Sequence, residues 1–142
     1  MAAKTTTSTA KRGEPSPASV DRSSYCRDLD QWPRSWMGIE QDLAPGEQLL
    51  PLFRRFIEHL VASDLSAKTI RRHADNLWSL GGEIIRDLHY DQGLRKLPAE
   101  RLLRKSVHLY GGPAIHNGSE QQQRSFDATC RKLHRFLENT AA

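Results

Sequence analysis

The sequence predicts an all-α fold with four main helices, and three observations support this expectation. Apolar residues recur at helical spacing in four separate segments, and no segment shows the alternation of apolar and polar residues that is typical of a half-buried strand. Residues suited to helix starts stand where most of these patterns begin. The chain has 142 residues, which suits one domain of ordinary size.

The clearest helical pattern lies between residues 49 and 61. Its apolar stripe comprises Leu49, Leu52, Phe53, Phe56, Ile57, Leu60 and Val61. Proline is tolerated only in the first turn of a helix, and position 51 is a proline. The helix is therefore expected to begin near Leu49 and to end at Ser63.

A second helix is expected to start after Ser66, a good N-cap residue. Its apolar stripe comprises Ile70, Ala74, Leu77, Trp78, Ile84, Ile85 and Leu88. Gly81 and Gly82 interrupt the stripe without changing its phase, and each costs about 1 kcal/mol relative to alanine inside a helix. We therefore expect a kink at the two glycines or close packing against another backbone.

Two further helices are expected in the second half of the chain. Pro98 suits the first turn of a short helix, and Ser119 with Gln122 fits a capping box that opens the last one. Their apolar residues are Leu102, Leu103, Val107 and Tyr110 for the short helix and Phe126, Cys130, Leu133 and Leu137 for the last. Residues 90–96 and 111–119 are expected to be loops.

Composition divides the chain into three parts. Residues 1–24 contain almost no large apolar residue, so a disordered tail is expected there. Residues 25–45 contain Trp32 and Trp36, whose indoles are expected to pack on the helical domain, with a short helix at 35–43. Residues 46–138 are expected to form that domain.

Several classes of function are not expected. No run approaches about 18 consecutive apolar residues, and the N-terminus lacks the apolar region of a signal peptide, so we expect a cytoplasmic protein without a membrane span. The two cysteines form no CxxC, and the six histidines show no HExxH spacing. We therefore expect no metal, no cofactor and no enzymatic activity.

Basic residues gather on two of the expected helices. The formal net charge is +4, and the excess lies wholly within residues 45–142. The aligned cations are Lys68, Arg71 and Arg72 on the second helix and Arg124, Arg131 and Arg135, at i, i+7 and i+11, on the last. At the start of the second helix the dipole and the free amides also favour a phosphate. The two faces together favour nucleic-acid binding over plain solvation.

The stretch FRRFIEHLVASDLSAKTIRRHADNLWSLGG, residues 53–82, resembles the first two helices of the core-binding, SAM-like domain of phage integrases and other tyrosine recombinases. That family opens its second helix with Leu-Ser-x-x-Thr-Ile-Arg-x-Tyr. The matching residues are Leu65, Ser66, Thr69, Ile70 and Arg71, while His73 stands in place of the tyrosine. The resemblance implies a four-helix SAM-like fold over residues 46–138, with the second and fourth helices facing duplex DNA.

The resemblance implies that eight residues of this chain contact DNA. They are Ser66, Lys68, Thr69, Arg71, Arg72, Arg124, Arg131 and Arg135. A recombinase also needs a catalytic domain with a nucleophilic tyrosine, for which 142 residues leave no room. We therefore expect a free-standing, non-catalytic domain that binds duplex DNA, serves recombination or a mobile element, and is nucleoid-associated when bound. A separately encoded recombinase or another protein is a further expected partner.

A second class of function stays open. In this alternative the chain is a helical protein-interaction module or a subunit of a larger complex. Trp32, Trp36 and Phe136 then contact the partner, and the arginines only solvate the surface. Duplex DNA binding that falls steeply with salt separates the two hypotheses.

Overall fold

The computed structural model describes residues 28–140, and all regular elements in this range are helical. The α-helices are α1 (Trp32–Trp36), α2 (Leu43–Ala62), α3 (Ala67–Tyr90), α4 (Ala99–Ser106) and α5 (Glu120–Asn139), and the 3-10 segments are η3 (Leu29–Gln31), η4 (Glu40–Asp42) and η5 (Gln92–Lys96). The all-α prediction is confirmed, although the described range has five α-helices rather than four. The expected tail at 1–24 lies outside the described residues. None of the helices described is long and apolar enough to cross a membrane.

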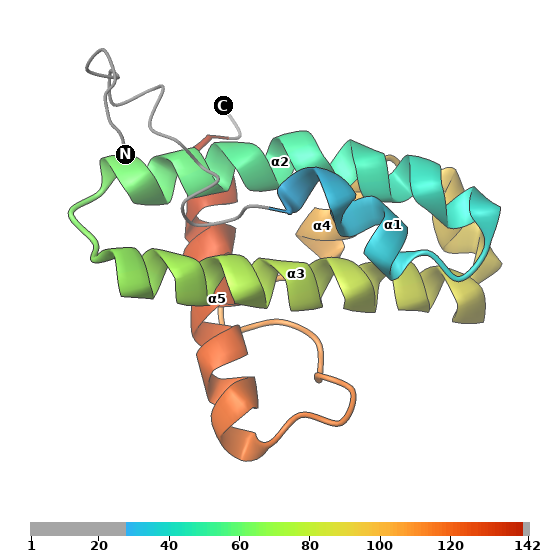
Figure 1. Cartoon of the computed structure of the whole chain (residues 1–142). Coiled ribbons are helices and arrows are strands. Elements are labelled where there is room, and N and C mark those ends of the chain that lie inside the picture. Colours follow the sequence, from blue (N-terminus) through green and yellow to red (C-terminus); the bar gives the residue numbers. More distant parts are fainter. Residues whose placement is uncertain (1–27, 141–142) are drawn as a thin grey trace, which may run out of the picture.

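The helices α2 and α3 form an antiparallel pair, and the other helices pack around it (Figure 1). The short α1 lies against both members of the pair. The helix α5 crosses α3 steeply near the N-terminal end of α3, and the first half of α5 extends beyond the pair (Figure 1). The core is built from the apolar faces of these helices, and its largest fully buried side chains include Phe53, Phe56, Leu77, Ile85 and Phe126.

The helix α2 begins well before its predicted start, and Pro51 lies inside it. Pro51 is on the exposed side of α2, where water can satisfy the carbonyl that loses its backbone partner. The early start is supported by packing, because Gly46 is buried and an added Cβ there would lie 3.1 Å from the Cβ of Pro33. The short helix accordingly lies at residues 32–36, not at 35–43.

A fully buried carboxylate fixes the turn that precedes α2. Asp42 Oδ2 accepts hydrogen bonds from the backbone amides of Gly38 and Ile39, at 2.8 and 3.0 Å. The same oxygen lies 2.8 Å from His89 Nε2, and Oδ1 accepts from Arg95 Nη2 at 2.9 Å. Burial alone raises the pKa of the Asp42 carboxyl, but these four partners outweigh it and hold the pKa well below its usual value.

The indole of Trp36 lies directly against Gly81 of α3. A Cβ at position 81 would overlap the atoms of the indole ring, so only glycine admits this contact. Trp36 Nε1 also donates a hydrogen bond to the backbone carbonyl of Trp78 at 2.9 Å. The helix α3 continues through both glycines, and the close neighbour is an indole rather than the expected backbone. The expected packing of Trp32 and Trp36 on the helical core is confirmed.

Trp78 lies outside the core, contrary to the prediction. Its side chain is 44% exposed, and its indole nitrogen donates to Ser35 Oγ at 2.9 Å. Trp36 fills the space against Gly81 that a second indole would need, so the buried stripe of α3 includes Leu80 in place of Trp78. Tyr110 is also exposed, because α4 ends at Ser106 and does not carry the stripe that far.

The two adjacent glycines of α3 should respond oppositely to substitution. Gly81→Ala should lower the free energy of unfolding by about 1–3 kcal/mol, because the new methyl group overlaps the Trp36 indole. Gly82→Ala should be neutral or raise it by up to about 1 kcal/mol, since its Cβ would lie at an ordinary 3.6 Å from Trp36 Cδ1 and alanine favours the helix. Urea denaturation followed by circular dichroism measures both, and equal effects would contradict the contact.

Candidate nucleic-acid interface

The N-terminus of α3 forms as the sequence predicted. Ser66 is the N-cap, and its Oγ accepts a hydrogen bond from the Thr69 amide at 3.1 Å and donates to Thr69 Oγ1 at 3.0 Å. The first turn contains no acidic residue. The hydroxyls of Ser66 and Thr69 are therefore both engaged in the cap. Either hydroxyl can contact a phosphate only in addition to its hydrogen bond in the cap.

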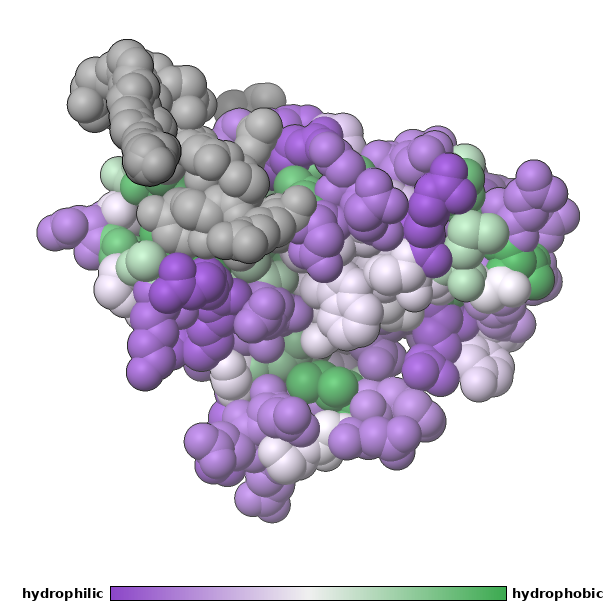
Figure 2. Space-filling model, viewed as in Figure 1, coloured by the Kyte–Doolittle hydropathy of each residue, from purple (hydrophilic) through white to green (hydrophobic). Residues whose placement is uncertain are grey.

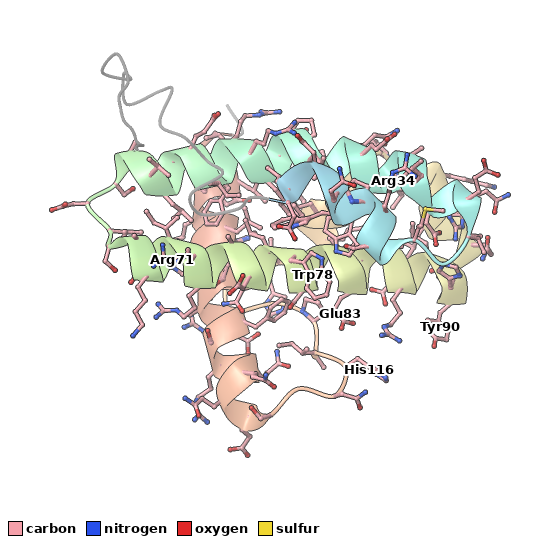
Figure 3. The ribbon with its side chains drawn as sticks, viewed as in Figure 1. Arg34, Arg71, Trp78, Glu83, Tyr90 and His116 are labelled. Atoms are coloured by element: carbon pink, nitrogen blue, oxygen red, sulfur yellow. The ribbon has the colours of Figure 1, made fainter. Side chains whose placement is uncertain are left out.

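Three cations project from the first two turns of α3. Lys68, Arg71 and Arg72 are exposed, and within residues 28–140 none of them has an ion-pair or hydrogen-bond partner. Arg71 is seen at this end of the helix in Figure 3. Their charges add to the positive end of the helix dipole, so this end of α3 is suited to an anion.

A buried polar cluster joins α3 to α5. His73 is 4% exposed, and its Nδ1 lies 2.7 Å from Thr129 Oγ1. Asn76 Nδ2 donates to the carbonyl and the hydroxyl of Ser125, at 3.2 and 3.1 Å, and to Thr129 Oγ1 at 2.8 Å. Hydrogen bonds require defined distances and angles, so this cluster fixes where α5 crosses α3.

Arg72 of α3 and Lys132 of α5 bring positive charge to the same buried ring. Burial lowers the pKa of His73 from 6.5 to about 4, and the charges of Arg72 and then Lys132 contribute to the lowering. The imidazole is therefore neutral at pH 7. Lys132 also lacks an ion-pair partner in the described part of the chain. We refer to Lys68, Arg71, Arg72 and Lys132 as the α3–α5 corner.

The three arginines predicted to form one stripe on α5 have different environments. Arg124 is exposed and forms an ion pair with Glu120 at 3.6 Å. Arg131 is half-buried and donates through Nη1 to the Tyr110 carbonyl at 3.4 Å, which directs it toward the turn at residues 108–111. Arg135 is exposed and has no partner among the described residues. Lys132 was not among the residues that the sequence analysis assigned to DNA contact.

A groove of about 670 Å³ runs along α3, beyond the α3–α5 corner. Its lining includes Trp36, Trp78, Ser79, Arg86, Tyr90 and Ile115. Figure 3 shows Trp78, Glu83 and Tyr90 along α3, with His116 across from them. Pale and green residues mark the middle of this face among purple ones in Figure 2. Sequence reasoning missed this groove because it assigned Trp78 to the core.

Residues 28–140 contain candidate metal ligands and one thiol, that of Cys130. In the part of the chain that is described, no group of three or more His, Cys, Asp or Glu side chains could hold a metal ion. Cys130 is buried, and burial with the nearby Asp127 raises the pKa of its thiol to about 12. Cys130 is therefore a protonated core residue.

Comparison with protein-family models, with curated proteins and with solved structures gives no match for this chain.

The buried His73 should make the stability fall with acid. The unfolded chain binds a proton near pH 6.5, whereas the folded state binds it only near pH 4, so stability is full above about pH 6.5 and is lost as the pH falls toward 4. At about 1.4 kcal/mol per pH unit, the loss should reach about 3 kcal/mol. Urea denaturation from pH 7 to pH 4 measures it.

His73→Gln is the matched variant, because glutamine can hydrogen-bond Thr129 without titrating. Subtracting its curve removes the contribution of Asp42, whose lowered pKa adds stability above about pH 3.8 that is lost only in stronger acid. A wild-type curve that runs parallel to that of the variant between pH 6.5 and 4 would contradict the buried neutral state.

Proposed function

We propose that the chain is a non-catalytic DNA-binding domain that holds duplex DNA by its phosphates at the α3–α5 corner. The observation that carries this proposal is that Arg72 of α3 and Lys132 of α5 both act on the buried His73, with Lys68 and Arg71 nearby in the first two turns of α3. None of these four cations has an ion pair to any described residue. Unpaired cations that two packed helices hold in place are suited to binding the phosphates of DNA.

The start of α3 supports phosphate binding in a second way. A phosphate there would interact with the positive end of a long helix as well as with the side chains of Lys68 and Arg72. Arg124 and Arg135 extend the basic surface along α5, and the ion pair of Arg124 is exposed enough to exchange for a phosphate. Contacts of this kind position a protein on DNA without reading its sequence.

The resemblance to the core-binding domain of tyrosine recombinases supports the same orientation. In that family the second and fourth helices face the duplex, and α3 and α5 are their counterparts when the short α1 is set aside. A SAM-like arrangement of the helices, a role in recombination or in a mobile element, a recombinase partner, and a cytoplasmic or nucleoid location all belong to this proposal.

A protein-interaction module is the second candidate function, but the residues first assigned to it are poorly placed. Trp32 is 4% exposed, Trp36 packs on Gly81, and Phe136 packs against Phe56 and His59. The observation that favours this function is a different patch, where adjacent Leu109 and Tyr110 are 62% and 79% exposed. Trp, Tyr and Arg are the residues that most often dominate protein interfaces.

The salt dependence of duplex binding tests the α3–α5 corner. Replacing Arg72 and Lys132 together with alanine should weaken binding to every duplex sequence, because two phosphate contacts are lost. The slope of log affinity against log salt should become shallower by about 0.9 per contact. Fluorescence anisotropy with a labelled duplex over a series of salt concentrations gives this slope.

Arg55→Ala with Arg101→Ala is the matched control, since both residues are exposed, have no partner among residues 28–140, and give the same change in net charge. The control should leave the slope nearly unchanged. Equal weakening by both pairs would mean that DNA responds only to overall charge, and the corner would have no special role.

A further inference from the structure

We infer that the groove beside α3 holds an unpaired base of the DNA bound at the α3–α5 corner, so that the preferred ligand is a duplex next to a single-stranded segment. This inference rests on the proposed function and adds a ligand class to it. Three features of the groove carry the argument: a fixed aromatic surface, room for a base, and cations on both sides.

Trp78 supplies the aromatic surface. It is 44% exposed, whereas Trp32 is buried and Trp36 is packed on the core. Its Nε1 is held by Ser35 Oγ at 2.9 Å, and its backbone carbonyl accepts from Trp36 Nε1 at 2.9 Å. The ring is therefore held in place at the surface and loses little freedom when a base stacks on it.

The groove has the size and lining of a small-molecule site. Its volume of about 670 Å³ lies within the roughly 300–1,000 Å³ range of such sites. Ile115 provides an apolar contact, and Ser79 and His116 provide groups that can hydrogen-bond a base edge. A base inside an intact duplex is stacked and paired, so only an unpaired base can enter.

Basic residues stand on both sides of Trp78 along α3. Arg71 precedes it by one heptad and so lies on the same side of the helix, about 10 Å away along the axis. Arg86, whose side chain is 42% exposed, follows about 12 Å beyond Trp78 and lines the groove. An aromatic platform between cations is the arrangement with which proteins bind single-stranded nucleic acids.

Two acids also lie along this side of α3. The Glu83 side chain is only 13% exposed, and its carboxylate accepts from the His116 amide at 3.1 Å and lies 3.8 Å from Arg86 Nε. This ion pair partly neutralises the charges of both Glu83 and Arg86. Asp75 is exposed and should repel a phosphate that passes from Arg71 toward Trp78.

The test compares three DNA probes on the full chain: a blunt duplex of about 20 base pairs, the same duplex with a short oligo(dT) overhang, and oligo(dT) alone. The overhang duplex should bind at least about fivefold more tightly than the blunt one, and it should quench the tryptophan emission. Trp78→Ala should abolish this preference and leave the affinity for the blunt duplex unchanged.

Trp78→Phe should keep most of the preference while losing the quenching, which separates stacking from a change in folding. Asp75→Asn should strengthen overhang binding, whereas Glu47→Gln on the exposed side of α2, with the same change in charge, should have no effect. Equal affinity for blunt and overhang duplexes would overturn this inference and leave the proposed function standing. If no probe binds even at low salt, both fall.

Discussion

The contact between the Trp36 indole and Gly81 determines how the rest of α3 is presented. Because the ring occupies the place of a side chain at position 81, α1 can lie between α2 and α3, with Trp36 edge-on to Phe53 at 6.2 Å. Trp78 is then excluded from the core and is held at the surface by Ser35. The exposed aromatic groove is thus a direct result of how the core is closed.

Polar contacts hold α3 near both of its ends. His73 and Asn76 hydrogen-bond to α5, and at the other end His89 contacts the buried carboxylate of Asp42, which also binds Arg95. With α1, α2 and α5 in place, one face of α3 is left to solvent, and it carries the basic residues and Trp78. Rigid support of this kind lowers the entropic cost of binding, since only side chains need to order.

Local signals in the sequence predicted the helices that carry the candidate site. The cap at Ser66 and the capping box at Ser119 are interactions between residues three apart, so they can be read without knowing the fold. The start of α2 depends on how Gly46 packs against Pro33 and Trp36, and the exposure of Trp78 depends on Trp36, which is distant from it in sequence. Neither contact can be read from local spacing. Likewise, the rotation of α5 is set by its crossing with α3. This rotation brings Lys132 near His73, on which Arg72 also acts, and directs Arg131 toward the Tyr110 carbonyl.

The crossing of α3 and α5 also links the proposed binding to the stability of the fold. In the free protein burial, and then the charges of Arg72 and Lys132, disfavour the protonated form of His73, and the neutral ring keeps its contact with Thr129. A phosphate bound at the α3–α5 corner would offset these two charges and so remove their share of the lowering of the His73 pKa, while the larger share from burial would stay. With phosphate bound, the stability that the fold loses through His73 in acid would therefore be smaller. By linkage, a ligand that binds the folded state at this crossing also stabilises the crossing itself.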